Sequence, residues 1–447
     1  MNSDRKKRRV RRLQKFLHVP LLLCLCTVLL SGCAAQKRLG QVMDKIREAL
    51  PDDPIHYIFF GDDGDMSSVS GNNGDAQHTE ENTAGDEADR ENTEADESGS
   101  EETGSDSPSL DDLAKDERAY CFSKITADEK KVYLEIYNCF LNMSDNTELS
   151  TLDADVIDRV FNLVMMDHPE LFFVDGYRTT ETTRNGVPVK IEISGKYNVS
   201  PDVRKMKEKE IAKIAEAALK DCPRDGSEYE QVRYVFQWII DHTDYSLEAP
   251  DNQNISSVFL NGRSVCQGYT MATKYLLDKL GIFCTVVYGT ADGESHSWNL
   301  VRMDGTECYV DTTWGDASYR TEDSSLAPHT NYNYFGCNED ILRRTHAINN
   351  PVKLPSCTAL DEYYYVKEGR YFTSADFNRL KALFEYESSQ EDDNFTIRCS
   401  DGNVYQSLSS ALFDERKIFE ILPESDSVKY IRDDREFTMT FSAGSES

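Results

Sequence analysis

Residues 296–311 read His296-Ser-Trp-Asn-Leu-Val-Arg-Met-Asp-Gly-Thr-Glu-Cys-Tyr-Val-Asp311, and they predict a β-hairpin. Two alternating runs flank Asp304-Gly305, a dipeptide that favours a two-residue turn. In this register Arg302 pairs with Glu307, and their opposite charges support the pairing. The same register places His296 and Asp311 on one face, one diagonal step apart. We therefore expect the carboxylate to accept a hydrogen bond from the imidazole and to fix its tautomer.

An earlier segment, Gly262-Arg-Ser-Val-Cys-Gln-Gly-Tyr269, leads into apolar residues at helical spacing that end at Gly281. Ser264 is a reasonable N-cap, which places Cys266 in the first turn of the predicted helix. There the helix dipole and the free N–H groups favour a thiolate. Residues 282–288 then read as a strand that leads towards the hairpin. A thiol, an imidazole and a carboxylate in this order are the parts of a cysteine nucleophile, its base and the group that orients the base.

Three blocks of the chain resemble the motifs of the transglutaminase-like superfamily: Ser-Val-Cys266-Gln-Gly-Tyr, Ser-His296-Ser-Trp-Asn-Leu-Val and Tyr-Val-Asp311-Thr-Thr-Trp-Gly-Asp. The resemblance covers roughly residues 200–350 and implies a papain-like fold with Cys266, His296 and Asp311 as a catalytic triad. It also implies that an acyl group is transferred from an amide through a thioester. The family includes cross-linking enzymes, proteases, peptide N-glycanases and inactive members. A non-catalytic surface binding module on the same fold is therefore the alternative.

Aromatic residues near these motifs are candidates for a substrate groove: Trp298, Trp314, Trp238 and Tyr269. Packing in the core is the alternative for each of them. The Cys266 amide is one candidate donor to an oxyanion, and Trp238 and Gln237 are the candidates for a second donor. The expected substrate is a protein or peptide, including cell-wall peptide. Water is the abundant acyl acceptor at a wet cell surface, so we expect hydrolysis rather than transamidation.

The amino terminus predicts export and a lipid anchor. A basic stretch, Arg5–Arg12, precedes a short apolar run, Phe16–Leu30, which ends in Leu30-Ser-Gly-Cys33. This ending resembles the lipobox of bacterial lipoproteins, which implies that residues 1–32 are removed and that Cys33 is lipidated. The expected location is the outer face of the bacterial cytoplasmic membrane. The alternatives are an uncleaved anchor, for which the apolar run is short, and a secretory signal cleaved near Ala34-Ala35.

The charge of the chain excludes one class of partner. Removal of residues 1–32 takes away eight basic residues and one acidic residue, which changes the net charge from −31 to −38. Nucleic-acid binding is therefore not expected, because no basic patch is present to meet phosphates. Residues 61–116 contain 19 Asp or Glu against two basic residues, and they predict a disordered, extended acidic linker. Residues 33–60 are the expected membrane-proximal segment.

The rest of the chain has a globular composition of the α+β class. We expect a helical region with a hairpin at 117–200, the papain-like core at 201–356 and a small α+β domain at 357–447. In the last of these, Tyr363–Val366, Phe395–Cys399 and Phe437–Phe441 alternate like strands, whereas Phe377–Phe384 and Leu408–Phe419 read as helices. No chemistry of its own is visible there, and binding or packing is its expected role.

Twelve cysteines are present, and an exported location permits disulfides. Their spacings are irregular and contain no paired C-x-x-C motif, so we expect no structural metal and no cofactor. Cys284 and Cys308 fall in predicted core strands and are expected to stay reduced.

Overall fold

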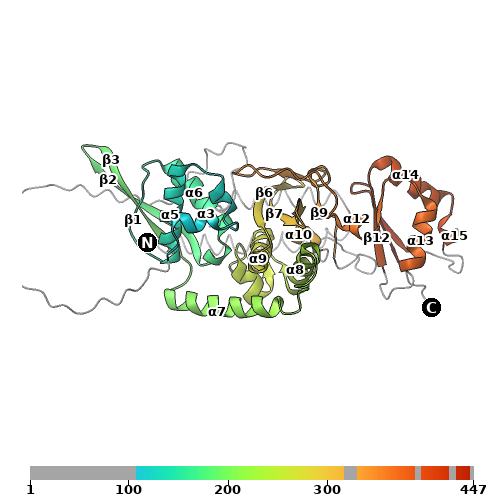
Figure 1. Cartoon of the computed structure of the whole chain (residues 1–447), viewed down its shortest axis with the longest axis horizontal. Helices are drawn as coiled ribbons and strands as arrows, with labels where there is room; N and C mark the ends of the chain where they lie inside the picture. Colours follow the sequence, from blue (N-terminus) through green and yellow to red (C-terminus); the bar gives the residue numbers. More distant parts are fainter. Residues whose placement is uncertain (1–106, 317–329, 388–393, 422–428, 443–447) are drawn as a thin grey trace, which may run out of the picture. The chain divides into compact units, whose positions relative to one another are not determined.

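The computed structural model describes residues 107–316, 330–387, 394–421 and 429–442 (Figure 1). All of them belong to one compact unit that spans Ser67–Ser447. The expected signal peptide, Cys33, the membrane-proximal segment and most of the acidic linker lie outside the described residues. Within the described ranges, no helix has the length and apolar character needed to cross a membrane.

The first described region combines helices with a three-stranded sheet. Its helices are α3 (Leu110–Lys115), α4 (Tyr120–Ser123), α5 (Ala127–Leu141) and α6 (Ala154–Asp167), and its strands β1 (Thr147–Glu148), β2 (Val174–Arg184) and β3 (Val187–Tyr197) lie in the order β1-β3-β2. Helix α3 lies inside the segment 61–116 that we expected to be disordered. A capping box between Ser109 and Asp112 explains this helix, because it satisfies free N–H groups of the first turn.

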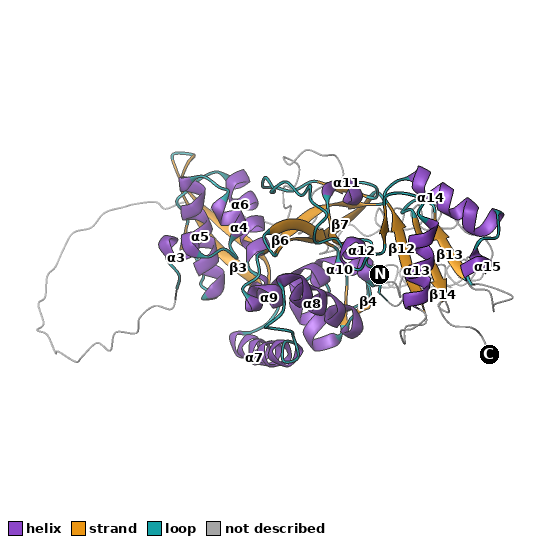
Figure 2. Cartoon of the chain, turned by 45° about the vertical axis from the view of Figure 1, so that its right-hand side comes forward, coloured by secondary structure: helices purple, strands orange, loops and turns teal. Residues whose placement is uncertain are grey.

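The core packs one long helix against a five-stranded sheet. Helices α7 (Pro201–Ala218) and α8 (Glu228–His242) precede α9 (Cys266–Leu280). The sheet has the order β10-β6-β7-β8-β9, with β6 at Cys284–Ala291, β7 at Glu294–Met303, β8 at Thr306–Val310, β9 at Phe335–Cys337 and β10 at His346–Ile348. Figure 2 shows α8 and α9 beside β6 and β7.

The predicted hairpin register is confirmed, because Arg302 pairs with Glu307 across the β7–β8 turn. Asp304 and Gly305 both have positive φ angles, of 49° and 86°, as a two-residue turn of this kind requires. The predicted helix and its end are also confirmed: Gly281 adopts the left-handed conformation at the carboxyl end of α9. The strand predicted for 282–288 starts two residues later, at Cys284.

The C-terminal region has its own four-stranded sheet, in the order β11-β12-β14-β13. Its strands are β11 (Tyr371–Phe372), β12 (Asn394–Cys399), β13 (Tyr430–Asp433) and β14 (Thr438–Ser442), and its helices are α12 (Tyr364–Lys367), α13 (Phe377–Glu387), α14 (Gly402–Ser409) and α15 (Ile418–Ile421). Figure 2 shows α13 and α14 beside this sheet. Apolar residues from these elements form a separate core cluster, which contains Phe372, Leu380, Phe384, Phe395, Tyr405, Leu408 and Phe441. The part of this region that follows α12, residues 371–442, is referred to below as the C-terminal unit.

Two predictions for the C-terminal residues were wrong. The Tyr363–Val366 stretch lies in the helical turn α12 rather than in a strand, because the Tyr363 carbonyl accepts from the N–H groups of Val366 and Lys367, at 2.9 and 3.0 Å, and these bonds close a local turn. The helix predicted for Leu408–Phe419 begins earlier, at Gly402, where the Asp401 side chain caps it. It then breaks into the π-type turn η5 (Ser410–Asp414) before α15.

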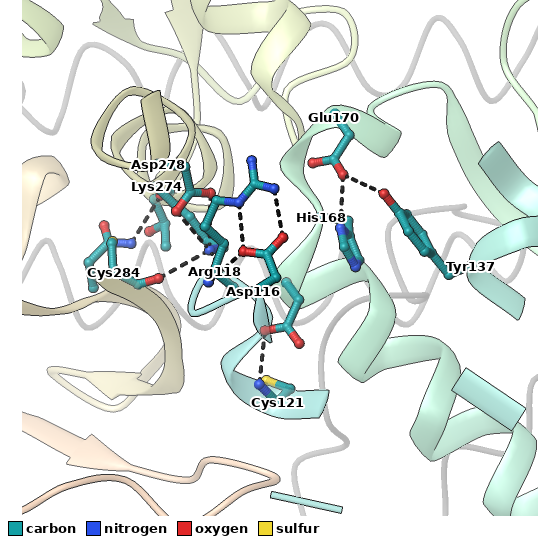
Figure 3. A network of polar contacts seen from close by, with 12 residues as sticks. Asp116, Arg118, Cys121, Tyr137, His168, Glu170, Lys274, Asp278 and Cys284 are labelled. Atoms are coloured by element: carbon teal, nitrogen blue, oxygen red, sulfur yellow. Dashed lines mark hydrogen bonds and ion pairs between the residues drawn. The ribbon is translucent and has the colours of Figure 1, made fainter. Parts of the chain in front are cut away.

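A buried polar network joins the first region to α9 (Figure 3). Lys274, on α9, is fully buried, and its ammonium donates to the Arg118 and Cys284 carbonyls and to Asp278, at 3.0–3.2 Å. Its three protons therefore all have acceptors. The Asp167 carboxylate accepts from the N–H groups of Cys121 and Phe122 at 3.0 Å each. The Lys274 contacts hold the helix that begins with Cys266 against Arg118 and β6, and the Asp167 contacts hold α4 on α6.

Candidate active site

Cys266 is the first residue of α9, and Val265 is the N-cap of this helix. The expected N-cap, Ser264, has another role: its hydroxyl donates to the Asn252 carbonyl at 2.8 Å and contacts the Ser257 hydroxyl at 2.6 Å. Gly268 makes this tight turn feasible, because a Cβ atom there would lie 1.9 Å from Ser264 Oγ. Cys266 therefore lies at the positive end of a 15-residue helix whose first N–H groups have no side-chain cap.

His296 and Asp311 meet as the hairpin register predicts. His296 lies on β7, and its Nε2–H donates to Asp311 Oδ2 at 2.7 Å. The β7–β8 ladder ends at the Asn299–Val310 pair. Asp311 follows it as the N-cap of α10 (Thr312–Gly315), where Oδ1 accepts from the Trp314 N–H at 2.9 Å. Each carboxylate oxygen thus has a fixed partner, which holds the side chain in one orientation.

The thiol of Cys266 hydrogen-bonds to His296. Because Nε2 of His296 binds Asp311, the contact with the thiol falls to Nδ1. Burial opposes the charged form of Cys266, but the hydrogen bond and charge of His296 lower the pKa of this thiol below its usual value. Burial likewise opposes charge on His296, but the charge and hydrogen bond of Asp311 raise the pKa of the imidazole to about 10. The arrangement favours a thiolate–imidazolium pair.

This property separates Cys266 from the other cysteines of the described residues. Burial raises the pKa of each of the other eight: Cys121, Cys139, Cys222, Cys284, Cys308, Cys337, Cys357 and Cys399. All nine are buried and none forms a disulfide. Within the described residues, Cys266 is therefore the one cysteine whose surroundings favour the thiolate.

Two residues of the site were missed in the sequence. Ser297 is fully buried, and both its peptide N–H and its side chain hydrogen-bond to the Cys266 sulfur, which lowers the thiol pKa further. In the sequence, the position of Ser297 next to His296 was the only indication that Ser297 belongs to the site. His346, on β10, donates Nε2–H to the same oxygen, Asp311 Oδ2, at 3.0 Å. Nothing in the local sequence around His346 indicated this contact, because it depends on an edge strand 50 residues after His296.

The two histidines and Asp311 also form the one group of potential metal ligands found in the described residues, with ligand atoms within 4.8 Å of one another. The distances from Asp311 Oδ2 to the two nitrogens, 2.7 and 3.0 Å, are those of hydrogen bonds. Two ligands of a tetrahedral zinc ion lie about 3.3 Å apart. The geometry is thus that of a carboxylate shared by two N–H donors.

Burial favours core packing for Tyr269 and Trp298, whereas Trp314, with 6% of its surface exposed, is as accessible as Cys266 at 5%. Tyr269 is fully buried, and its hydroxyl lies 2.6 Å from the Thr243 carbonyl and 2.9 Å from Asp316 Oδ2. Trp298 is also fully buried and stacks on His296, and Trp314 is buried and tilted against His346. Tyr269 and Trp298 therefore pack around the site, and a substrate contact at Trp314 stays a prediction. Trp238 is half-buried and stacks on His242.

The candidates for the second oxyanion donor also change. The Gln237 carboxamide is occupied, because its oxygen accepts from Thr330 and Tyr332 and its nitrogen donates to Asp241. Tyr245 lies nearer to the reacting groups. It belongs to the short strand β4 (Asp244–Tyr245), which pairs with β5 (Arg263–Ser264) immediately before Cys266. Burial and the charges of Cys266 and Asp311 raise the pKa of Tyr245, so its phenol remains protonated and able to donate.

Comparison with known proteins identifies the core. Residues 218–314 match the sequence model of the Transglutaminase-like superfamily. The chain therefore contains a transglutaminase-like core within a mixed helix and sheet fold, and the matched residues include Cys266, His296 and Asp311. His346 and the C-terminal unit lie outside the match.

Kyphoscoliosis peptidase of Mus musculus is 26% identical over 141 residues, which cover 28% of this chain and 21% of the mouse protein. The Homo sapiens protein is 24% identical over the same length and coverage. The chain thus spans about a fifth of the length of the curated relatives it matches. Similar solved structures include a TGase (14% identity, 34% of this chain and 54% of that chain, TM-score 0.24). A second is a putative cysteine protease from Cytophaga hutchinsonii (13% identity, 30% of this chain and 61% of that chain, TM-score 0.21). A third is the periplasmic domain of TgpA from Pseudomonas aeruginosa (16% identity, 30% of this chain and 57% of that chain, TM-score 0.20).

Proposed function

We propose that this protein is a surface-anchored cysteine enzyme that cleaves amide bonds of proteins or peptides through a thioester on Cys266, with water as the main acyl acceptor. One observation carries the proposal: Cys266 alone among the nine described cysteines has a lowered pKa. The cause of this shift is an imidazole held by Asp311 at 2.7 Å. A buried ion pair of this kind is unfavourable for stability alone and is typical of a prepared nucleophile.

The proposed reaction has two steps. In the first, the Cys266 thiolate attacks the amide carbonyl, a carbon–sulfur bond forms and the carbon–nitrogen bond breaks. The departing amine takes the proton that His296 holds on Nδ1. In the second, His296 removes a proton from water, the resulting hydroxide attacks the thioester, and the acid leaves as Cys266 is restored. Asp311 keeps Nε2 of His296 hydrogen-bonded throughout, so Nδ1 remains the nitrogen that exchanges protons.

The choice of acceptor is tested by competition between water and an amine. The full-length chain is incubated with a peptide mixture that contains cell-wall peptides and glutamine-containing peptides, together with a primary amine such as glycine ethyl ester. Mass spectrometry then counts new carboxylates and new amides. We expect carboxylates to predominate. Predominance of amides would assign transamidation, and the absence of both products in a chain with an intact, low-pKa Cys266 would favour a binding module.

The proposed lipid anchor of the enzyme is tested separately by a substitution at Cys33. Replacing Cys33 by alanine removes the proposed lipid attachment atom, so the chain should move from the membrane fraction to the soluble fraction after cell lysis. The two acyl chains of one diacylated cysteine bury enough methylene groups to anchor a protein stably, whereas an unmodified chain has no such contact. Cys26→Ala, in the same expected signal peptide, is the matched control and should leave fractionation unchanged. Equal membrane binding of all three proteins would refute the lipid anchor.

A further inference from the structure

A continuous line of hydrogen bonds, buried at both ends and partly buried at Thr345, leads from Asp311 into the C-terminal unit. His346 Nε2 contacts Asp311 Oδ2 at 3.0 Å, and His346 Nδ1 contacts the Thr345 hydroxyl at 2.8 Å. The Thr345 hydroxyl contacts the Tyr334 hydroxyl at 2.5 Å, and Tyr334 contacts Glu436 Oε1 at 2.7 Å. Glu436 belongs to the loop between β13 and β14. We call these four residues, His346, Thr345, Tyr334 and Glu436, the relay.

Counting protons in the relay shows that one end must carry an extra proton. Its three internal contacts each need one proton, but the hydroxyls of Thr345 and Tyr334 supply only two. The third proton lies either on Nδ1 of His346 or on the carboxyl of Glu436. Since Nε2 of His346 already donates to Asp311, a proton on Nδ1 makes His346 an imidazolium cation.

The surroundings of Glu436 decide which end holds this proton. The fully buried Arg398 donates from Nη2 to Glu436 Oε2 at 2.9 Å, which stabilises the ionised carboxylate. Burial and the charge of Glu436 raise the pKa of Tyr334 well above its usual value, so the phenol keeps its proton and donates it to Glu436. The Tyr334 oxygen then accepts from Thr345, and Thr345 accepts from Nδ1 of His346.

We infer that the C-terminal unit forms part of the catalytic site, because the ionised Glu436 acts through the relay to keep His346 positively charged beside Asp311. His346 is thus a positioning residue that shares the Asp311 carboxylate with His296. The inference rests on the proposed cysteine chemistry and adds a function for the 371–442 region, which the family match does not reach.

The charge on His346 acts on the reacting groups at short range. The His346 and His296 ring centroids are 5.6 Å apart, with Asp311 bound to both. The other rings packed on His346 are those of Trp298, Trp314 and Tyr334, at 4.6–5.0 Å, and they leave little water to screen the charge. The backbone carbonyl of Thr345 accepts from the N–H of Asp292, and the Asp292 carboxylate forms an ion pair with Arg435. The charged groups that face His346 directly are therefore Asp311 and His296.

The sign of the effect follows from the charge. A cation near a titrating site favours the thiolate of Cys266 and disfavours the protonated form of His296. Loss of the positive charge on His346 should therefore move both the acidic and the alkaline limb of the pH profile to higher pH. A residue that only supports the fold would reduce stability or the amount of active protein without moving either limb.

Two variants interrupt the relay, and two serve as controls. In Tyr334→Phe the Thr345 hydroxyl is free to turn and donate to Nδ1 of His346, which leaves the imidazole neutral. In Thr345→Val the acceptor for the Nδ1 proton is lost. Thr345→Ser keeps the hydroxyl and the relay. Tyr405→Phe removes a buried phenol of the C-terminal unit that bonds to Asp434 and has no part in the relay.

The test measures the rate at which iodoacetamide alkylates Cys266 in the full-length chain as a function of pH, with the labelled peptide identified by mass spectrometry. We expect the midpoint of the acidic limb to rise by about one pH unit in Tyr334→Phe and Thr345→Val, and to stay at the wild-type value in Thr345→Ser and Tyr405→Phe. An unchanged or lowered midpoint in both interrupting variants would overturn the inference. A wild-type midpoint at or above that of an ordinary thiol would instead overturn the proposed cysteine chemistry.

Discussion

Replacing Cys266 by alanine should abolish amide turnover, with a loss of about 10⁴-fold or more in kcat/KM. The methyl group cannot form the carbon–sulfur bond on which both proposed steps depend. Whatever turnover remains comes from binding and orientation of the amide alone. The rate is measured on the most rapidly cleaved peptide of the competition experiment, with the full-length variant and wild type at equal concentration.

Cys284→Ala is the matched control for this variant. Cys284 is fully buried on β6, in contact with the same core, and burial raises the pKa of its thiol. Its loss should cost about 1 kcal/mol of folding free energy through the small cavity that remains, while kcat/KM stays within about twofold of wild type. Turnover that survives in Cys266→Ala and disappears in Cys284→Ala would reverse the assignment of the nucleophile.

Replacing Asp311 by asparagine should lower kcat/KM by about 10³- to 10⁴-fold. The neutral amide no longer stabilises the His296 imidazolium, so the thiolate–imidazolium pair becomes less favourable. An amide nitrogen facing either histidine would also impose the wrong tautomer, because Oδ2 accepts from both imidazoles. Steady-state kinetics should show the loss in kcat, with KM changed little, since the carboxylate is fully buried and out of reach of a substrate.

The same substitution should change how folding stability depends on pH. The charges and hydrogen bonds of His296 and His346 overcome burial and hold the pKa of Asp311 well below its usual range. A lowered carboxyl pKa contributes stability above the unfolded value of about 3.9, and this contribution is lost as the pH falls through the folded value. The pKa of His296 is raised to about 10, so its contribution is complete below about 6.5 and is lost as the pH rises towards 10. Both contributions are therefore present together between about pH 4 and 6.5.

Urea unfolding across this pH range measures the effect. Wild type should lose stability on both sides of the window, and Asp311→Asn should show a flatter profile on the acidic side. Asp167→Asn is the control, because Asp167 is also a buried carboxylate that accepts two backbone N–H groups but contacts neither His296 nor His346. It should lose about 1–3 kcal/mol of stability and retain the wild-type pH profile of catalysis. Equal kinetic losses in both variants would mean that Asp311 has only a structural role.

Local sequence patterns predicted much of the core. The Asp304-Gly305 turn and the Arg302–Glu307 pair were sufficient to place His296 and Asp311 on one face, because a hairpin register follows from adjacent residues. The position of Cys266 in the first turn of α9 also followed from local spacing. The N-cap was misassigned because the Ser264 hydroxyl bonds to Asn252, a contact with another part of the chain that no local pattern reveals.

The residues that were missed depend on tertiary contacts. His346 and Glu436 reach the site through the edge strand β10 and through a loop of the C-terminal unit. Gly289 illustrates this dependence, since a Cβ atom there would lie 2.0 Å from the Ala347 carbonyl and would keep β10 from closing on β6. The roles of Trp298 and Tyr269 also depend on tertiary contacts: the sequence left a groove position and core packing open, and full burial of both side chains favours core packing.

Formation of an acyl-enzyme is the most direct test of the central claim that Cys266 is the nucleophile of an acyl transfer. The full-length chain is mixed with p-nitrophenyl acetate, quenched in acid and analysed by intact mass and peptide mapping. We expect one acetyl group per chain, attached to Cys266 as a thioester that hydroxylamine removes, and none in Cys266→Ala. Acetylation of another residue in place of Cys266 would contradict the claim. So would a chain that carries no acetyl group although unreacted p-nitrophenyl acetate is still present.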